Sequence, residues 1–216
     1  MNDTVPFATV NAYYYLEHGL VSLGNAFLEE PFMDVNNEAR TYGALGFIMG
    51  HELSHALSER KENPLWQTGG ALDVTFNNRA VENDCLTSHY KEKFCSTKKE
   101  QFCLDNDFEG FAEENFADVN GARLAYAAFN ASGNRRSPSD DKDFFLGLAQ
   151  SWCNPNVTAW YDEKLKDAEG KPLRHAPPNV RVNGALQQLK EFGEIFECRK
   201  GSEMNPISRC KTLGLV

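Results

Sequence analysis

The pentapeptide His51-Glu52-Leu53-Ser54-His55 is the feature that most constrains how this chain folds. It has the form H-E-x-x-H, and on a helix its two imidazoles fall one turn apart on the same face, where they can share one metal ion. The segment from about Glu38 to Arg60 has a helical pattern with small residues on one surface, and Pro64 closes it. The motif therefore predicts a helix that carries two metal ligands.

A second helix, predicted from about Phe108 to Phe129, supplies a third ligand. Catalytic zinc takes three protein groups and leaves the fourth position to water. Glu114 and Asp118 are four residues apart, so Glu114 is aimed at the metal and Asp118 lies one turn on, where it can hold a histidine by its other nitrogen. Glu113 is the rival ligand, but one residue along a helix is a turn of about 100°, which loses the register with Asp118. We therefore expect Glu114 to join the two histidines as ligands of one Zn²⁺ ion.

Glu52 has a separate role, as the candidate general base. It lies on the same turn as His51 without being a ligand, so it can accept a proton from water whose pKa the metal has lowered to about 7. Two imidazoles and one carboxylate are a known ligand set of zinc hydrolases. The metal site thus predicts hydrolytic chemistry.

The remaining elements follow from hydrophobic periodicity and from turn residues. Residues Val10 to Leu16 are β-branched and aromatic, which predicts a strand. A third helix is expected from Asp140 to Trp152, and a fourth from about Gly184 to Cys198 after a proline-rich loop. Residues 61–106 are polar and rich in turn residues. We therefore expect an α+β fold that is mostly α.

Composition excludes several classes of protein. The chain has 216 residues, 41% of them hydrophobic, and a formal net charge of −9. It can bury a core of its own, but it lacks the clustered Lys and Arg that nucleic-acid binding requires. No apolar run approaches the ~20 residues of a membrane span, and no signal peptide is visible after Met1. No G-x-S-x-G sequence and no phosphate-binding loop occurs, and the acidic stretch from Asp105 lacks the last glutamate of a calcium loop.

Six cysteines indicate an oxidising compartment. They include no C-x-x-C pair, which argues against zinc ribbons and thioredoxin-like sites. An even count without metal spacing is typical of disulfides, and N-x-S/T sequons at Asn2, Asn130 and Asn156 agree with export. Free buried thiols in an intracellular protein are the alternative. Since an exported chain needs a leader, we expect this one to be a piece of a longer protein.

Several segments of the chain match, in the same order, segments of one protein family. They are V-N-A-Y-Y at 10–14, H-E-L-S-H at 51–55, E-N-F-A-D at 114–118, F-F-L-G-L-A-Q-S-W-C at 144–153, H-A-P-P-N-V-R at 175–181, and E-C-R-K, M-N-P and a final cysteine within 197–210. Because these segments extend along essentially the whole chain, the chain resembles the neprilysin and endothelin-converting-enzyme family of zinc metallopeptidases. The resemblance implies a zincin (thermolysin-like) catalytic domain with an edge strand, an active-site helix and a second zinc-ligand helix. It also implies that residues 1–216 are a single catalytic segment, without the family's N-terminal helical domain and membrane anchor.

The resemblance implies roles for residues outside the two helices. Asn11 and Ala12 look like edge-strand residues that hold an extended peptide by backbone pairing. His175 looks like the donor to the oxyanion of the tetrahedral intermediate, and Arg181 like the anchor of the substrate carbonyl beyond the scissile bond, also touching Asp118. The residues that align with the family's pocket for the residue after the cut are Phe27, Phe32, Phe47, Ile48 and Trp152. For these apolar side chains, ordinary core packing is an equally good interpretation.

The chain departs from the family pattern near the metal and at its C-terminus. Ser58 stands where a carboxylate close to His55 is expected, and such losses typically cost 10 to 100-fold in metal affinity or activity. Asn120-Gly121 replaces a Gly-Gly pair, and the family's final tryptophan is missing. Cys95 and Cys103 match no family cysteine and are expected to form a local loop.

The resemblance also implies how the other cysteines pair. Cys85 is expected to bond Cys210. Cys153 and Cys198 match cysteines that bond the family's N-terminal part, so in this chain they are left as free thiols or form improvised pairs.

Together these features predict a zinc-dependent endopeptidase, or the C-terminal segment of one, that cleaves small peptides on the amino side of hydrophobic residues. Peptides are the expected partners, and the family places the protein outside the cell, secreted or as the ectodomain of a membrane-anchored protein. A folded but inactive extracellular zinc-binding or decoy module is the second hypothesis, because this segment is expected to lack the domain that encloses the substrate chamber in the family. A structural disulfide module without stoichiometric zinc is the third. No oligomeric state follows from the sequence.

Overall fold

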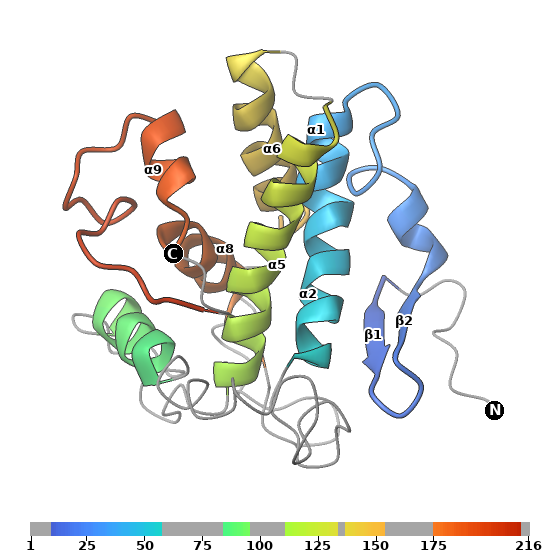
Figure 1. The fold of residues 1–216 in the computed structure, drawn as a ribbon, viewed down its shortest axis with the longest axis horizontal. Coiled ribbons are helices and arrows are strands. Elements are labelled where there is room, and N and C mark those ends of the chain that lie inside the picture. Colours follow the sequence, from blue (N-terminus) through green and yellow to red (C-terminus); the bar gives the residue numbers. More distant parts are fainter. Residues whose placement is uncertain (1–9, 58–83, 96–110, 134–136, 154–174, 213–216) are drawn as a thin grey trace.

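A computed structural model of the chain describes residues 10–57, 84–95, 111–133, 137–153 and 175–212. Within these ranges the fold is mostly helical, with one two-stranded sheet beside the helices (Figure 1). The expected α+β class, mostly α, is confirmed. None of the helices within the described ranges is long and apolar enough to cross a membrane.

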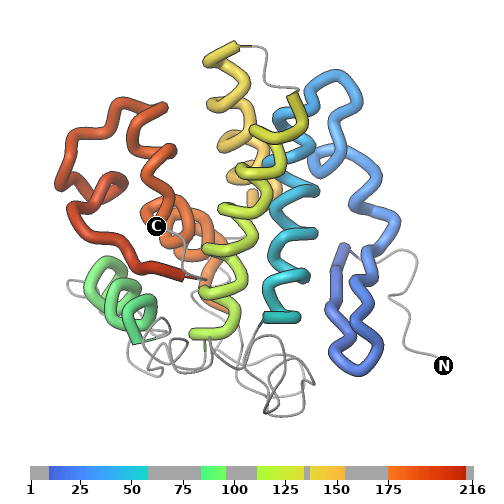
Figure 2. The backbone as a smooth tube through the Cα atoms, viewed as in Figure 1, coloured from blue at the N-terminus to red at the C-terminus, as the bar shows by residue number. Residues whose placement is uncertain are grey.

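The centre of the fold is the contact between α2 (Phe47–Ala56) and α5 (Ala112–Ala131), which run side by side (Figure 2). A methyl group on Gly50 would lie 2.8 Å from the carbonyl oxygen of Gly121, and one on Gly121 would lie 2.7 Å from the amide nitrogen of His51. Backbone therefore meets backbone here, which only residues without a side chain allow. This approach brings the motif on α2 against the first turns of α5.

The helix with the motif begins well before α2. Its first turn is α1 (Glu38–Thr41), which continues through the π-helical segment η2 (Tyr42–Gly46) into α2. The Asn37 side chain accepts a hydrogen bond from the Arg40 amide at 3.1 Å, which satisfies an amide that the helix leaves unpaired. The expected helix from Glu38 is confirmed as far as Ala56, and residues 58–60 lie outside the described ranges.

The sheet is an antiparallel hairpin of β1 (Ala12–Tyr15) and β2 (Leu20–Leu23), in which Ala12 is opposite Leu23. The predicted strand from Val10 to Leu16 is confirmed, although it is shorter. β1 lies against α2, and its other edge pairs with no strand within the described residues. Within the described residues, β1 is therefore an edge strand of the sheet and lies against the motif helix.

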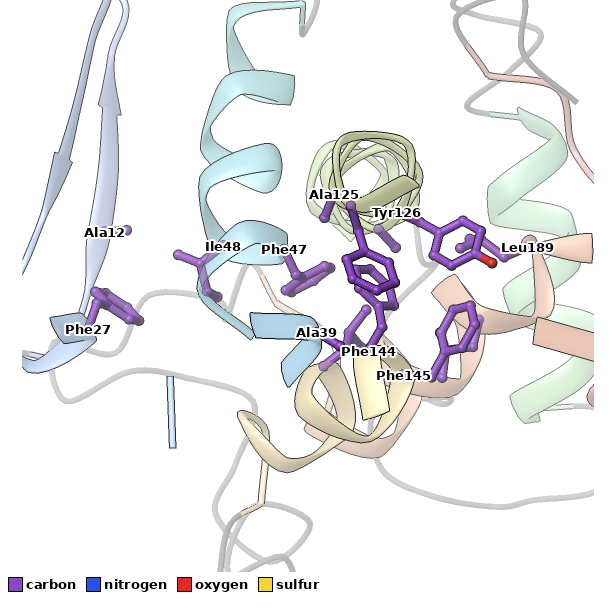
Figure 3. Close-up of a cluster of buried hydrophobic side chains, with 14 residues drawn as sticks. Ala12, Phe27, Ala39, Phe47, Ile48, Ala125, Tyr126, Phe144, Phe145 and Leu189 are labelled. Atoms are coloured by element: carbon purple, nitrogen blue, oxygen red, sulfur yellow. The ribbon is translucent and has the colours of Figure 1, made fainter. Parts of the chain in front are cut away.

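The main core lies between α2, α5 and α6 (Pro138–Gln150), and the predicted third helix is thus confirmed with a shift of two residues. Ser137 begins α6, since its amide donates to the Asp140 carboxylate at 2.7 Å. Burying a phenylalanine contributes about 1.5–3 kcal/mol, so the aromatic cluster holds these helices together. Figure 3 shows its members, among them Phe47, Tyr126, Phe144 and Phe145.

The expected fourth helix is wrong as a single element. It is two helices, α8 (Pro178–Gln187) and α9 (Lys190–Ile195). Leu189 separates them because its backbone is extended and its side chain is buried, only 2% exposed. α8 also begins earlier than expected, since Pro178 already has the backbone angle of a first helical residue.

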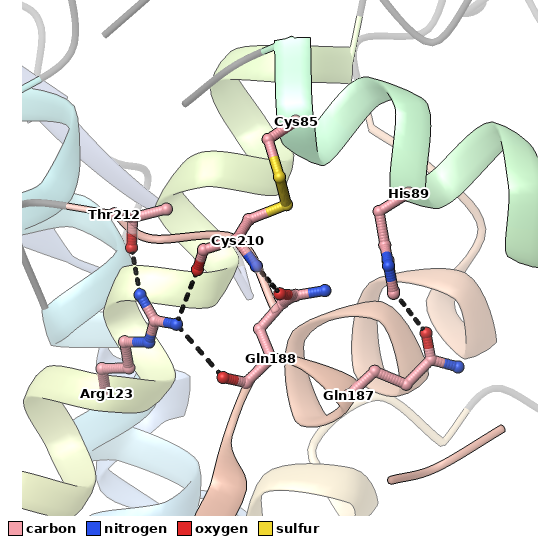
Figure 4. Close-up of a disulfide and its surroundings, with 7 residues drawn as sticks. All are labelled: Cys85, His89, Arg123, Gln187, Gln188, Cys210 and Thr212. Atoms are coloured by element: carbon pink, nitrogen blue, oxygen red, sulfur yellow. Dashed lines mark hydrogen bonds between the residues drawn. A yellow bond between two sulfur atoms is a disulfide. The ribbon is translucent and has the colours of Figure 1, made fainter. Parts of the chain in front are cut away.

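A disulfide ties the C-terminal segment to the helix at 84–90, which continues into η5 (Lys91–Cys95). Cys85 and Cys210 are bonded, with 5.8 Å between their Cα atoms, as the family resemblance predicts. Arg123 of α5 donates to the carbonyl oxygen of Cys210 at 3.0 Å, so the same segment is also held to the central helix (Figure 4).

The remaining cysteines divide into bonded and free. Cys153 and Cys198 are free thiols, which confirms the first of the two states expected for them. Cys95 is disulfide-bonded. Its expected partner Cys103 lies outside the described residues.

Ser58 and the sequons at Asn2 and Asn156 also lie outside them. Asn130 is exposed in the last turn of α5.

Candidate metal centre and substrate cavity

Three side-chain atoms from α2 and α5 converge on one point. The Nε2 atoms of His51 and His55 are 3.1 Å apart, and Glu114 Oε2 lies 3.2 Å from the first and 3.7 Å from the second. The histidines are one turn apart on α2 and Glu114 is in the first turn of α5, so helix geometry positions each of them. The structure thus brings together the three residues expected to bind the metal.

The spacing of these atoms fits a tetrahedral zinc ion. Ligand atoms about 2.0–2.1 Å from the metal would be about 3.3–3.4 Å from one another, within the range measured here. Glu114 Oε2 is buried, and among the described residues none of its contacts has hydrogen-bond geometry. A buried carboxylate oxygen without a hydrogen bond is unfavourable unless a cation binds to it. Glu52 also brings a ligand atom within 4.8 Å of both histidines, but the contacts of Glu114 at 3.2 and 3.7 Å favour it as the third ligand.

Asp118 holds His51 from the side opposite the metal position. Its Oδ1 atom is 2.8 Å from His51 Nδ1. The same carboxylate accepts hydrogen bonds from Arg181 Nε and Nη2, each at 2.7 Å, and both side chains are buried. A histidine fixed at Nδ1 presents Nε2 in one orientation, so Asp118 acts on the metal site through His51.

These contacts shift the pKa values of the charged groups. Burial opposes ionisation of Glu114, but His175 and His51 outweigh it and hold its pKa below the usual value. Burial also opposes charge on His51, yet the hydrogen bond to Asp118 and the nearby carboxylate of Glu114 raise its pKa to about 9. Burial is again outweighed at Asp118, whose pKa falls to about 2 beside Arg181 and His51. In the metal-free protein a proton on His51 therefore competes with a metal ion.

Glu52 lies at the wall of the cavity next to the histidines and is only 6% exposed. Burial raises the pKa of its carboxyl group, against the opposing effect of His51. A raised pKa makes a carboxylate a stronger base. Its surroundings therefore suit proton transfer.

A cavity of about 510 Å³ opens beside the convergence point. Its walls come from β1, α2, the first turn of α5, the end of α6 and the region of α8. The candidate metal ligands and Glu52 line it. So do most of the other expected site residues, namely Asn11, Ala12, Phe27, Phe32, Ile48, Trp152, His175 and Arg181. Glu113 is not among the lining residues.

Phe47 is the exception among the expected pocket residues, and its assignment is corrected. It is 1% exposed and belongs to the main core, with its ring edge-on to Trp152 at 6.1 Å. Successive residues on a helix point about 100° apart, so Ile48 faces the cavity and Phe47 faces the core. Asp118 does not line the cavity either, and it is fully buried behind His51.

Trp152 connects the apolar part of the cavity to its charged part. Its ring lies over the Arg181 guanidinium, 4.1 Å from ring centroid to Cζ. Phe27 and Phe32 pack edge to face at 4.7 Å on the apolar side. The cavity thus has an apolar wall and a cationic wall that meet at one tryptophan.

His175 is close to the metal ligands although it is distant in sequence. Its Nε2 atom is 3.1 Å from Glu114 Oε2, and its side chain is 48% exposed. It can therefore reach both the ligand set and a molecule in the cavity.

Sequence reasoning missed several lining residues, namely Val10, Tyr13, Tyr14, Leu16 and Ser151. The first four belong to the predicted strand, so the sequence located the strand but not its contact with the cavity. Ser151 directly precedes Trp152, and adjacency to a pocket residue was the available signal. Which strand edge faces the cavity depends on how β1 packs against α2.

The profile of peptidase family M13 matches residues 11–212 of this chain. An endothelin-converting enzyme homolog from Locusta migratoria is 32% identical, and neprilysin-3 from Drosophila melanogaster is 29% identical, each over 94% of this chain. The alignments cover 28% and 26% of those proteins, so the chain spans about a quarter of the length of these curated relatives.

Solved structures share the fold. The inhibitor complex of the zinc metalloprotease Zmp1 from Mycobacterium tuberculosis superposes with a TM-score of 0.71 at 22% identity, over 94% of this chain and 32% of that one. The Haemonchus galactose-containing glycoprotein complex gives a TM-score of 0.71 at 24% identity, over 95% and 36%. The expected zincin fold is thereby confirmed.

Proposed function

The chain belongs to peptidase family M13, and on this premise we propose that it is the catalytic segment of a zinc-dependent endopeptidase that cleaves small peptides on the amino side of hydrophobic residues. The observation that carries the proposal is the convergence of His51 Nε2, His55 Nε2 and Glu114 Oε2, all within 3.7 Å of one another at the wall of a cavity. Zinc held by these residues would polarise the peptide carbonyl and lower the pKa of water to about 7.

Glu52 is the general base of the proposed reaction. It accepts a proton from the attacking water and passes it to the amine nitrogen that departs when the peptide bond breaks. Its burial and its place beside His51 at the cavity wall support this role. The raised pKa of Glu52 helps the first transfer, because a carboxylate whose conjugate acid has a higher pKa is a stronger base.

The substrate is held in extended form along β1. Asn11 and Ala12 line the cavity, and the outer edge of β1 pairs with no other strand among the described residues. Backbone hydrogen bonds to such an edge bind peptides of many sequences, and selectivity then comes from a pocket. The apolar wall of Phe27, Phe32, Ile48 and Trp152 provides that pocket for the residue after the cut.

His175 and Arg181 act on the substrate carbonyl groups. His175 donates to the oxyanion that forms as water attacks, which is often the largest contribution to catalysis. Arg181 lines the cavity while Asp118 holds its Nε and Nη2 atoms, so it reaches the carbonyl beyond the scissile bond from a fixed position. Asp118 is a positioning residue for both His51 and Arg181.

The proposed location is extracellular, with peptides as the partners. The Cys85–Cys210 disulfide and the bonded Cys95 support an oxidising compartment, where such bonds persist.

Replacing Glu52 by glutamine tests the proposal. Glu52→Gln should bind one zinc ion per chain but hydrolyse a short fluorogenic peptide at least about 100-fold more slowly, as expected when a general base is lost. Glu113→Gln is the matched control, because Glu113 does not line the cavity, and it should keep both properties. Persistent hydrolysis by Glu52→Gln would show that another group is the base.

The same assay separates the second function, an inactive zinc-binding or decoy module. The observation behind that alternative is that the chain spans only about a quarter of the length of its relatives. Stoichiometric zinc without turnover by the unaltered chain would favour it, and an absence of zinc binding would refute the ligand assignment.

A further inference from the structure

Tyr90 is a fully buried side chain that the proposed mechanism does not use. It lies in the helix at 84–90, in a cluster of buried apolar side chains separate from the main core. This cluster also contains Phe116 and Val119 of α5 and Val180 of α8. Asp118 lies between the first two in sequence, and Arg181 follows the third. Tyr90 is thus packed among the immediate neighbours of both partners of the buried ion pair.

The hydroxyl end of Tyr90 rests on the backbone of α8. A methyl group on Gly184 would be 2.3 Å from the ring carbon that bears the hydroxyl group and 2.5 Å from its oxygen. Contacts that short do not occur, so only glycine fits at this position. Gly184 is three residues after Arg181, which places the two on nearby parts of the helix surface. The tyrosine therefore sets how closely α8 approaches next to Arg181.

The phenol is also close enough to the ion pair to respond to its charges. Burial is the main reason that the pKa of Tyr90 lies well above its usual value, and Asp118 raises it further while Arg181 opposes the shift. The Tyr90 phenol therefore stays neutral at the pH values at which the protein works. It acts through its packing and through the dipole of its hydroxyl group.

The helix of Tyr90 is itself fixed at further points. Cys85 bonds Cys210, and His89 Nε2 lies 2.8 Å from Oε1 of Gln187 in the last turn of α8 (Figure 4). Tyr90 thus contacts α8 at Gly184, and His89 contacts it at Gln187, three residues further along the helix. Two side-chain contacts hold the helix at 84–90 against α8, and the disulfide ties the same helix to the segment of Cys210.

We infer that Tyr90 is a positioning residue for Arg181, and that the disulfide-tied helix at 84–90 sets where the Arg181 guanidinium stands in the cavity. The ion pair with Asp118 holds Nε and Nη2 of the guanidinium, and Tyr90 packs against the helix from which the arginine extends. The effect of Tyr90 on substrate binding rests on the proposed function, whereas its effect on the position of Arg181 does not.

The first test is independent of enzymatic activity. The Arg181 Nε–H group donates to Asp118 at 2.7 Å, so its NMR signal, assigned by its loss in Arg181→Lys, reports the position of the guanidinium. In Tyr90→Phe and Gly184→Ala this signal should shift, and its exchange with water should become about tenfold faster. If Gly184→Ala does not fold, Tyr90→Phe decides alone.

Matched controls separate positioning from general stability. Tyr126→Phe removes another buried tyrosine hydroxyl, one that donates to Asp141 in the main core. Gly46→Ala adds a methyl group in a helical segment where the nearest atom is 3.7 Å away. Both should leave the Arg181 signal unchanged, whatever they do to the melting temperature. An unchanged Arg181 signal in folded Tyr90→Phe would overturn the inference.

A second measurement connects the position to substrate. Tyr90→Phe should raise KM for the fluorogenic peptide by about two- to tenfold with little change in kcat, because a displaced guanidinium weakens binding of the substrate in the ground state and in the transition state alike. Zinc affinity should stay the same. A fall in kcat alone would overturn the role in substrate positioning. If the unaltered chain does not hydrolyse peptides, the proposed function fails, while the NMR comparison still decides the position of Arg181.

Discussion

Gly50 of α2 and Gly121 of α5 are in direct backbone contact, so a methyl group on either residue would lie less than 3.0 Å from the other helix. This contact sets the distance between the two helices that carry the candidate metal ligands. His51 follows Gly50 directly, and Asp118 is one turn before Gly121. The geometry of the candidate metal centre therefore depends on two residues that contribute no side chain to it.

Gly121→Ala should separate the two helices. We expect a loss of about 1–3 kcal/mol in the free energy of unfolding, as for other overpacked cores, together with weaker zinc binding. Denaturant unfolding and a zinc titration measure the two effects. Gly46→Ala is the control and should be neutral or slightly stabilising, because its methyl group has room and alanine favours helices. Zinc affinity equal to that of the unaltered chain would contradict this account.

Asp118→Asn should weaken zinc binding by about 10 to 100-fold, because His51 loses the carboxylate that orients it. It should also cost about 3–5 kcal/mol of stability, since the buried Arg181 loses its nearest counter-charge. Isothermal titration and chemical unfolding measure these losses. Asp143→Asn is the comparison, because its pair with Arg40 at 3.4 Å is partly exposed and is worth less than about 1 kcal/mol. Similar costs for both substitutions would refute the role of Asp118.

The pH dependence of the metal-free protein should report the protonation of His51. Its pKa is about 9 in the folded protein against an ordinary value of 6.5. A group whose pKa is raised by folding contributes stability that is complete below pH 6.5 and is lost as the pH rises through 9. We expect a decrease of at most about 3 kcal/mol across that interval, measured by thermal unfolding. Zinc should abolish the dependence and release a proton on binding, whereas an unchanged profile with zinc would exclude His51 as a ligand.

Phe32→Ala should enlarge the apolar side of the cavity. It removes the edge-to-face partner of Phe27, which packs against it at 4.7 Å. For peptides with leucine or phenylalanine after the cut, kcat/KM should fall by about 10-fold or more, and peptides with alanine there should be affected less. Val35→Ala, at a residue that is 79% exposed, should change neither. An equal loss for all peptides would place the pocket elsewhere.

The sequence determined what depends on local helix geometry. The 3.6-residue period alone places His51 and His55 on one face of α2, and Glu114 and Asp118 on one face of α5, whatever surrounds the helices. Hydrophobic periodicity and turn residues likewise predict α6 to within two residues at each end.

Tertiary structure decided what depends on which faces meet. Sequence pattern could not separate Ile48, which faces the cavity, from Phe47, which faces the core, because both are apolar neighbours on one helix. It could not locate the break at Leu189, where a buried leucine with extended backbone ends one helix and begins the next. It also left open which edge of β1 lines the cavity. Each of these depends on the packing of segments distant in sequence, which local periodicity does not encode.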